Sequence, residues 1–260
     1  MKKIRIFPLC MALVLLLCSL VACKDPVEDV LTPAIALTKA TAALESTPYT
    51  VEMEMELSCE DPTYASLFEV REMDVVMKVK GEDFLLDMQV SEFANMTITC
   101  VGDTAYYLIY TFGQYNCKKT LLTDAQKNEL FAQKGASLGI EAKDFANLSL
   151  QKGENGEIII DCTDLSSDAM AKLVEESLGD LSAEGMHVSV KNVSMQLEIE
   201  HDRYDSIELV ATYLVVIGDQ SFELGMKIDM DYDYSAFAPI TAPENADSYK
   251  LTTYESLFGK

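Results

Sequence analysis

The chain has 260 residues, of which 43 are acidic and 20 are basic, and its formal net charge is −23. Such an acidic protein is repelled by phosphate backbones and anionic lipid headgroups. This excludes nucleic acid as a partner and excludes electrostatic docking flat on a membrane. No Gly/Ser-rich or Pro-rich linker and no low-complexity segment divides the sequence. We therefore expect one domain after the N-terminal segment, present as a monomer.

Residues 1–22 have the features of a bacterial export signal. Three basic residues lie within the first five positions, and an apolar run over residues 6–17 follows, too short for a stable membrane span. The segment ends in LVAC, residues 20–23, which resembles the lipobox of bacterial lipoproteins. The alternative is an ordinary secretory signal in which Cys23 is incidental.

The lipobox predicts that Cys23 becomes the new N-terminus as a diacylglyceryl cysteine carrying chains such as palmitate. Two acyl chains anchor a protein stably, so we expect an exported protein held extracytoplasmically on the bacterial membrane. Loss of residues 1–22 removes three basic residues and no acidic one, which leaves a net charge of −26. Residues 23–32 are then a lipidated tether that reaches no more than about 35 Å, and residues 33–260 are the folded domain.

The domain begins with a helix and continues with an antiparallel meander. Thr32 and Pro33 form a typical helix start, and the Ala-rich sequence after them predicts a helix over residues 33–46. Alternation of apolar and polar residues then predicts strands at residues 51–59, 68–80, 84–90, 96–100 and 104–111.

Helices and long strands follow in the second half of the domain. Thr123 and Gln126 fit a capping box for a helix to about Gln133, and Ser166 and Gly179 fit the start and stop of a helix over residues 166–178. Residues 136–151 give no clear pattern. Further strands are predicted at residues 157–162, 187–200, 204–218 and 220–234, before a tail punctuated by proline.

The predicted strands are longer than usual and apolar on one face only. Long, twisted strands of this kind curl, and an open curled sheet cannot leave its concave apolar face in water. We therefore expect an α+β fold in which a long, strongly curved antiparallel sheet forms a half-barrel. Helices near residues 33–46, 123–133 and 166–178 are expected to cover its concave face.

The order of these elements resembles the LolA/LolB-type lipoprotein-carrier fold and its Gram-positive and mycobacterial relatives of the LppX/LprG type. The segments VEMEMEL, MDVVMKVKGEDFLLDMQV, MTITCVGDTAYYL and FELGMKIDMDYDY carry the similarity, which covers most of residues 33–240. The resemblance implies an incomplete barrel whose apolar interior holds acyl chains of lipids or lipoproteins. The internal cysteines depart from the family pattern.

The apolar strand faces are the candidate ligand site. Methionine is flexible and polarizable, and it suits a surface that accepts varied apolar shapes. The candidate residues are Met53, Met55, Leu57, Met77, Val79, Leu86, Met88, Met96, Ile98, Leu224, Met226, Ile228 and Met230. Alternatively they simply pack on the helices, and the protein is a protein-binding or sensory module of the cell envelope whose acidic face carries the partner site.

Other chemistries are weakly indicated. Residues 135–139 match the G-x-S-x-G motif of hydrolases, but that motif needs a parallel α/β sheet, and His187 and His201 lie at a strand start and a turn. The aspartates at 229, 231 and 233 are typical of a solvated sheet face and lack the pattern of a calcium loop. We expect no enzymatic activity, no metal and no cofactor.

The internal cysteines permit two disulfides in an exported chain, or they all stay reduced. They are Cys59, Cys100, Cys117 and Cys162. A hairpin turn at residues 101–104 places Cys100 beside Ala105, and a turn at residues 112–114 places Cys117 near Ile109. Four residues along a strand span about 13 Å, which disfavours a Cys100–Cys117 disulfide.

Overall fold

The computed structural model describes residues 31–65, 72–91, 94–127, 142–153, 156–170, 186–235 and 238–258. The chain divides into residues 1–32 and a compact unit of residues 33–260, and the following description concerns the second unit. Cys23 and the G-x-S-x-G motif at residues 135–139 lie outside the described residues.

Strands dominate the described part of this unit. The helical elements are α2 (Pro33–Ser46), α3 (Pro62–Ala65), η1 (Ala142–Asp144), η3 (Ala246–Ser248) and α6 (Glu255–Phe258). The strands are β1 (Tyr49–Cys59), β2 (Glu72–Lys80), β3 (Asp83–Ser91), β4 (Ala94–Val101), β5 (Thr104–Thr111), β6 (Gln114–Leu121), β7 (Phe145–Lys152), β8 (Ile158–Leu165), β9 (Met186–Glu200), β10 (Arg203–Ile217), β11 (Gln220–Asp233) and β12 (Lys250–Leu251).

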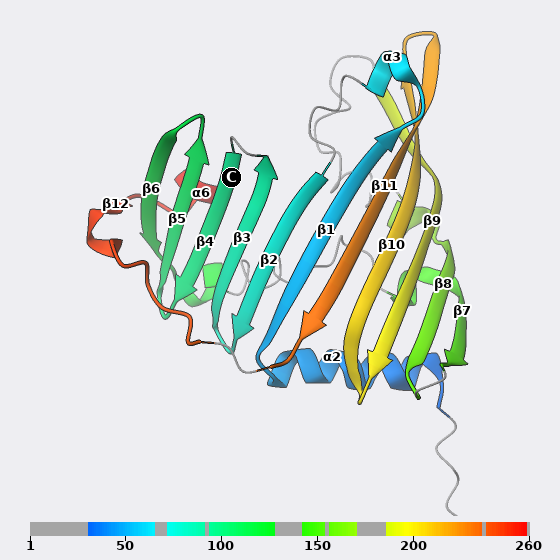
Figure 1. Ribbon diagram of the computed structural model, residues 1–260, viewed down its shortest axis with the longest axis horizontal. Coiled ribbons are helices and arrows are strands. Elements are labelled where there is room, and N and C mark those ends of the chain that lie inside the picture. Colours follow the sequence, from blue (N-terminus) through cyan, green and yellow to red (C-terminus); the bar gives the residue numbers. More distant parts are fainter. Residues whose placement is uncertain are drawn as a thin grey trace, which may run out of the picture. The chain divides into compact units, whose positions relative to one another are not determined.

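All the strands belong to one open sheet. The order is β12-β6-β5-β4-β3-β2-β1-β11-β10-β9-β8-β7, with twelve strands and with β12 and β7 at its edges. Every neighbouring pair is antiparallel except β12 and β6, which run parallel. Figure 1 shows β1 beside β11 in the middle of the sheet, so strands from the two ends of the domain are neighbours. The expectation of a long antiparallel sheet is confirmed, although the fold is mostly β and its helices are few.

The register keeps the apolar residues of successive strands on one side of the sheet. Met55 of β1 lies opposite Ile228 of β11, and Ile228 lies opposite Leu209 of β10. The same parity continues outward, where Val75 of β2 faces Met88 of β3. We call this side the apolar face and the other side the acidic face.

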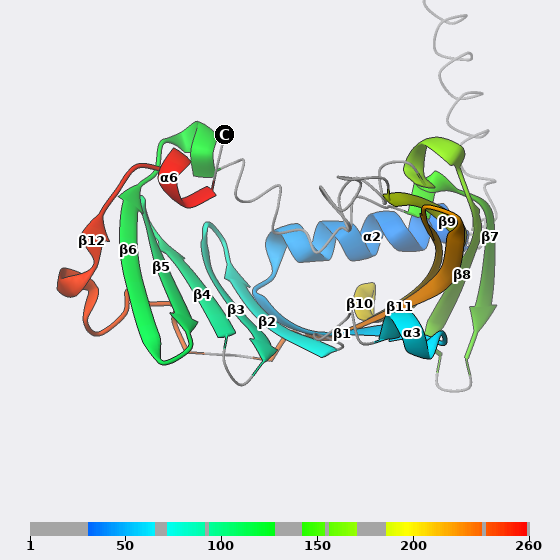
Figure 2. The ribbon, with the colours of Figure 1, turned by 90° about the horizontal axis from the view of Figure 1, so that it is seen from above.

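The helix α2 lies against the apolar face. Its buried residues Ala36 and Ala40 are small, so the helix can approach the sheet closely. Thr41 Oγ1 lies 3.0 Å from the hydroxyl oxygen of Tyr204, and Lys39 makes an exposed ion pair with Asp202 at 3.2 Å. The main contacts of α2 are with β10 and β7, and Figure 2 shows the helix on one side of the sheet.

The two other expected helices begin where the sequence predicts. The Thr123 backbone N–H donates to Gln126 Oε1 at 2.9 Å, and the Gln126 N–H donates to Thr123 Oγ1 at 3.3 Å, which confirms the capping box. The Ala169 N–H donates to Ser166 Oγ at 3.3 Å, so Ser166 caps the second helix start. The rest of both predicted helices, after residues 127 and 170, falls on residues outside the described part of the chain.

One turn differs from expectation by a residue. The β5–β6 hairpin uses the two residues Phe112 and Gly113, both with positive φ (46° and 81°), because such a turn matches the twist of the paired strands. Cys117 therefore lies opposite Leu108, not Ile109 as predicted.

The corrected register places Cys117 and Cys100 on opposite faces of the sheet, because Cys100 pairs with Ala105, three residues before Leu108. None of the cysteines at 59, 100, 117 and 162 forms a disulfide. Burial raises the pKa of the Cys162 thiol to about 12, so this thiol stays protonated at neutral pH.

Several elements escaped the sequence analysis. Strand β7 falls in residues 136–151, which gave no clear pattern, and β6 was assigned only as the return of a hairpin. Residues 246–258 form η3, β12 and α6, for which the sequence analysis gave only a tail punctuated by proline. Strand β2 begins at Glu72 within the described residues, four residues after its predicted start at 68.

Substitutions on the two faces of the central strands should differ in their effect on the free energy of unfolding. Ile228 is 0% exposed on the apolar face, whereas Val210 is 38% exposed on the acidic face of the neighbouring strand. We expect Ile228→Ala to lower the free energy of unfolding by about 2–5 kcal/mol through lost burial and a cavity. Val210→Ala is the control and should cost less than about 1 kcal/mol. Urea unfolding measures both, and equal costs would contradict the assignment of the faces.

Candidate functional site

The register brings every candidate residue predicted for the apolar site onto the apolar face. Met53, Met55 and Leu57 pair with Met230, Ile228 and Met226 across β1 and β11. On the other side of β1, the face continues through Met77 and Val79, Leu86 and Met88, and Met96 and Ile98. Leu224 completes the predicted set, opposite Cys59.

This face is buried to different degrees along the sheet. Leu224, Met226, Ile228 and Met230 of β11 are buried, and so are Met77, Val79 and Ile98. Six residues of the predicted set are only half-buried, and they lie on β1, β3 and β4: Met53, Met55, Leu57, Leu86, Met88 and Met96. We call these six residues the methionine surface; strand β2, which lies between β1 and β3, contributes the buried Val75 and Met77 to the same face.

The position of α2 matches this difference. The main contacts of α2 are with β10 and β7, so it packs against the half of the sheet where the apolar face is most deeply buried. The methionine surface lies on the opposite side of β11 in the strand order. The predicted set therefore contains both ordinary core residues and residues that remain accessible.

Sequence reasoning missed the part of the apolar face on β8, β9 and β10. Its buried members include Ile160, Met195, Leu197, Leu209 and Tyr213. Strict alternation in residues 193–199, and alternation interrupted by Val210 and Leu214 in residues 207–215, carried the same signal as the strands that were used. These residues pack beneath α2 and form the main core.

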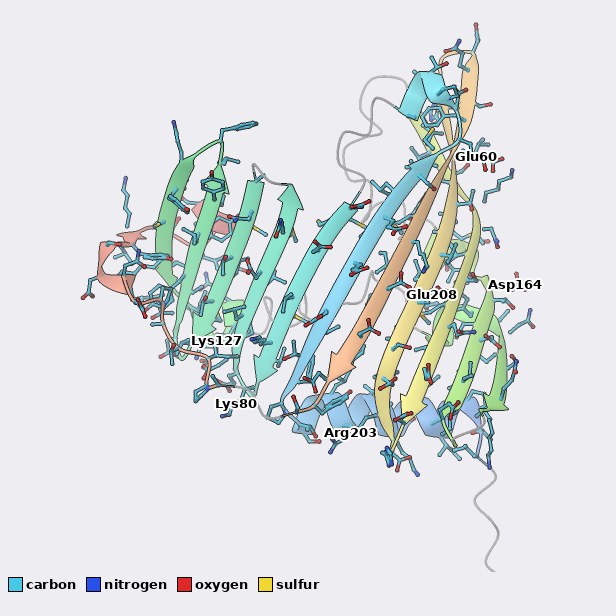
Figure 3. The ribbon with its side chains drawn as sticks, viewed as in Figure 1. Glu60, Lys80, Lys127, Asp164, Arg203 and Glu208 are labelled. Atoms are coloured by element: carbon cyan, nitrogen blue, oxygen red, sulfur yellow. The ribbon has the colours of Figure 1, made fainter. Side chains whose placement is uncertain are left out.

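Four tyrosines gather at the end of the apolar face near the start of β10. The ring centroids of Tyr49 and Tyr232 are 6.1 Å apart, those of Tyr204 and Tyr232 are 5.9 Å apart, and those of Tyr49 and Tyr234 are 6.3 Å apart. The guanidinium carbon of Arg203 lies 5.0 Å from the Tyr234 ring centroid, a cation–π distance. Figure 3 labels Arg203 at this end of the sheet.

The tyrosine cluster puts polar groups at one end of an otherwise apolar face. The Tyr234 hydroxyl is buried and has no hydrogen-bond partner among the described residues. Burial raises the pKa of Tyr49, of Tyr232 and of Tyr234, the last to about 12 despite the opposing charge of Arg203. The cluster therefore stays neutral well above physiological pH.

Lysine side chains form ion pairs with some of the carboxylates on the acidic face. Lys227 of β11 binds Asp229 Oδ2 at 2.8 Å and Glu208 Oε2 at 3.1 Å, which raises the pKa of Lys227. Figure 3 labels Glu208 on β10. A second ion pair joins Lys191 of β9 to Glu223 of β11. These contacts relieve part of the repulsion between neighbouring carboxylates.

The aspartates at 229, 231 and 233 have ordinary partners or solvent around them. Asp233 accepts hydrogen bonds from the backbone N–H and the hydroxyl of Ser235, both at 2.7 Å, which lowers the pKa of Asp233. Within the described residues, no group of three or more His, Cys, Asp or Glu side chains is arranged to hold a metal ion.

The histidines lie apart from each other on the sheet. His187 is on β9 opposite Val216, and His201 is in the β9–β10 turn with a 94% exposed side chain, 4.0 Å from Glu200.

In the part of the chain that the structure describes, no helix is long and apolar enough to cross a membrane.

Comparison with known proteins adds little. No protein-family model and no curated protein matches the chain. It is similar to the ywiB protein from Bacillus subtilis at 8% sequence identity, with 71% of this chain and 91% of that chain covered and a TM-score of 0.17. An inactive mutant of the CurK dehydratase is 9% identical, with 80% and 86% covered and a TM-score of 0.12.

The dehydratase domain from the CurF module of the curacin polyketide synthase is 10% identical. It covers 78% of this chain and 81% of its own length, with a TM-score of 0.12. TM-scores this low carry no argument about fold or function. They support neither a dehydratase nor the LolA/LolB resemblance.

The tyrosine cluster predicts a loss of stability in alkali. Unfolded tyrosines ionise near pH 10, whereas the buried Tyr234 resists ionisation until about pH 12. Its contribution to stability is therefore complete below pH 10 and is lost as the pH rises toward 12. Urea midpoints measured between pH 9 and 12 should fall less steeply in Tyr234→Phe than in the wild type. The exposed Tyr115→Phe is the control, and its curve should follow that of the wild type.

Proposed function

We propose that this chain is a membrane-anchored extracytoplasmic lipoprotein that binds acyl chains of lipids or lipoproteins on its apolar face. The observation that carries the proposal is the methionine surface, where Met53, Met55, Leu57, Leu86, Met88 and Met96 are only half-buried on a continuous apolar sheet face. A soluble domain with so many acidic residues on one side has little reason to leave this surface accessible unless an apolar ligand covers it.

Binding in this proposal needs no covalent chemistry. Each methylene removed from water contributes about 0.8 kcal/mol, so one long acyl chain is sufficient for tight binding. Methionine side chains adapt to chains of different length and unsaturation because they have three rotatable bonds. The tyrosine cluster would limit the apolar surface at one end, where its hydroxyls can meet the polar end of a ligand.

The proposal includes a half-barrel with helices over its concave face. Support comes from α2, which packs on the apolar face at β10 and β7, and from the arc that the strands follow in Figure 2. The confirmed helix starts at residues 124 and 167 add support, since both follow strands of the same sheet. The proposed membership of the LolA/LolB-type family rests on the lipobox and the methionine-rich strands.

A pair of neighbouring residues on β4 tests the proposed site. Met96 is half-buried on the apolar face, and Asn95 is exposed on the acidic face. Each can be changed to Glu, which adds the same charge one residue apart. We expect Met96→Glu to weaken uptake of a fluorescent fatty acid by at least about tenfold, because a carboxylate would be desolvated beside the acyl chain. Asn95→Glu should bind like the wild type.

Native mass spectrometry after gentle purification gives the decisive observation on occupancy. Co-purified lipid is the expected result. A clean apo mass, together with no fatty-acid uptake, would contradict the carrier and favour an envelope protein-binding module with a packed core.

The anchor is tested separately at Cys23. We expect the intact mass of the protein from bacterial membranes to begin at Cys23 and to include a diacylglyceryl group, because the residues before it resemble a lipobox. Cys23→Ser should abolish the modification and leave the chain uncleaved or released. An unmodified Cys23 in the wild-type mass spectrum would show that the signal is an ordinary secretory one.

A further inference from the structure

The tip of the β5–β6 hairpin exposes aromatic side chains to an unusual degree. Phe112 is 82% exposed and Tyr115 is 70% exposed, more than the other exposed large hydrophobic residues of the described part. The Tyr110 and Tyr115 rings are 4.9 Å apart, so Tyr110 supports Tyr115 from the neighbouring strand. The turn and its two flanking strands thus place the exposed Phe112 and Tyr115 and the half-buried Tyr110 at one end of the sheet.

The backbone at the tip places a bulky residue where a small one is usual. Phe112 has φ 46°, in the left-handed region that Gly, Asn and Asp occupy most readily. A phenylalanine in this conformation costs strain and here gains little burial in return. The sequence therefore places an exposed aromatic residue at a turn position where Gly, Asn or Asp would cost less backbone strain.

The hairpin also differs from the rest of the chain in charge. Residues 104–123 contain no Asp or Glu, which makes them the longest acid-free stretch after Cys23, and they contain Lys118 and Lys119. The domain as a whole is strongly acidic and is repelled by an anionic membrane surface. The β5–β6 hairpin is neutral at its tip and basic behind it, so it can approach such a surface without repulsion.

We propose that the hairpin tip formed by Tyr110, Phe112 and Tyr115 inserts into the headgroup region of a lipid bilayer. Amphipathic aromatic rings are stable at the membrane–water interface. The proposal rests on the proposed function, since the N-terminal anchor keeps the tip at a high local concentration near the bilayer. Weak insertion by a few side chains is then sufficient.

The tip lies close to one end of the methionine surface. Thr111 and Gln114 close the hairpin, and Ile109, two residues before Thr111, lies opposite Met96 of β4. An acyl chain that leaves the bilayer beside the tip would therefore meet Met96 after a short path along β5. Tyr110 and Tyr115 lie on the other face of the sheet, because Tyr110 is opposite Asn95. The inserted tip therefore places the end of the methionine surface near the membrane without lining the path itself.

A single tryptophan reports the position of the tip, because the chain contains none. Phe112→Trp places the probe at the tip, and Tyr115→Trp places it on regular strand backbone in case the turn does not tolerate the change. His201→Trp is the matched control, since His201 also has a positive φ (51°) in a two-residue hairpin turn and is exposed. The full chain is purified from membranes and reconstituted into phosphatidylcholine vesicles with brominated or ordinary acyl chains.

We expect Trp at positions 112 and 115 to emit at shorter wavelength and to lose intensity in brominated vesicles, while Trp at position 201 is unaffected. Absence of quenching at both tip positions, or equal quenching at all three, would overturn the proposal. A shift that depends on protein density and not on bromination would identify a second copy of the chain as the occupant instead.

The result is independent of acyl-chain binding. The acylated Cys23 holds the full chain on the vesicles whether or not the apolar face binds an acyl chain. Quenching at the tip together with a clean apo mass would reject the carrier function and retain the membrane contact. Bound lipid without quenching at the tip would retain the carrier function and reject the membrane contact.

Discussion

The structure depends on one constraint. The register of strand pairing aligns the alternating apolar and polar residues of each strand with those of its neighbours, so that the apolar residues share one side of the sheet. Met55, Ile228 and Leu209 share one side of the sheet because their strands pair without a slip. A slip of one residue would move carboxylates such as Glu54 to the apolar face and expose the core. The separation into an apolar and an acidic face, the packing of α2 and the methionine surface all follow from this alignment.

Side chains pack closely on the acidic face at the centre of the sheet. Gly225 of β11 lies opposite Ser58 of β1, and a Cβ atom at position 225 would stand 2.4 Å from the Ser58 hydroxyl oxygen. A side chain at position 225 would require the Ser58 hydroxyl to rotate away, whereas the Ser58 backbone oxygen, at 3.8 Å, would be in ordinary contact. Glycine thus lets the Ser58 side chain lie across β11 at the centre of the sheet.

The sequence was informative where a pattern is local. Alternation predicted the long strands and their apolar residues, and capping chemistry predicted the helix starts at Thr123 and Ser166. It was less informative for the edge strands: the apolar residues of β7 alternate only weakly, and β12 has two residues and pairs with β6, which is distant in sequence. The tyrosine cluster was missed for the same reason: Tyr49 and Tyr232 come together only when β1 pairs with β11. The split of the apolar face into buried and half-buried parts depends on where α2 packs, which no strand pattern encodes.

The pairing of β1 with β11 also has a consequence for the order of folding. Strands β2 to β6 and strands β7 to β10 each form meanders between sequence neighbours, but the two meanders are joined only through β1 and β11. Because β11 is the last long strand to be synthesised, the middle of the sheet cannot close until nearly the whole chain is available. Such distant pairing slows folding. For the exported protein proposed above, this delay would keep the incomplete polypeptide unfolded while it crosses the membrane.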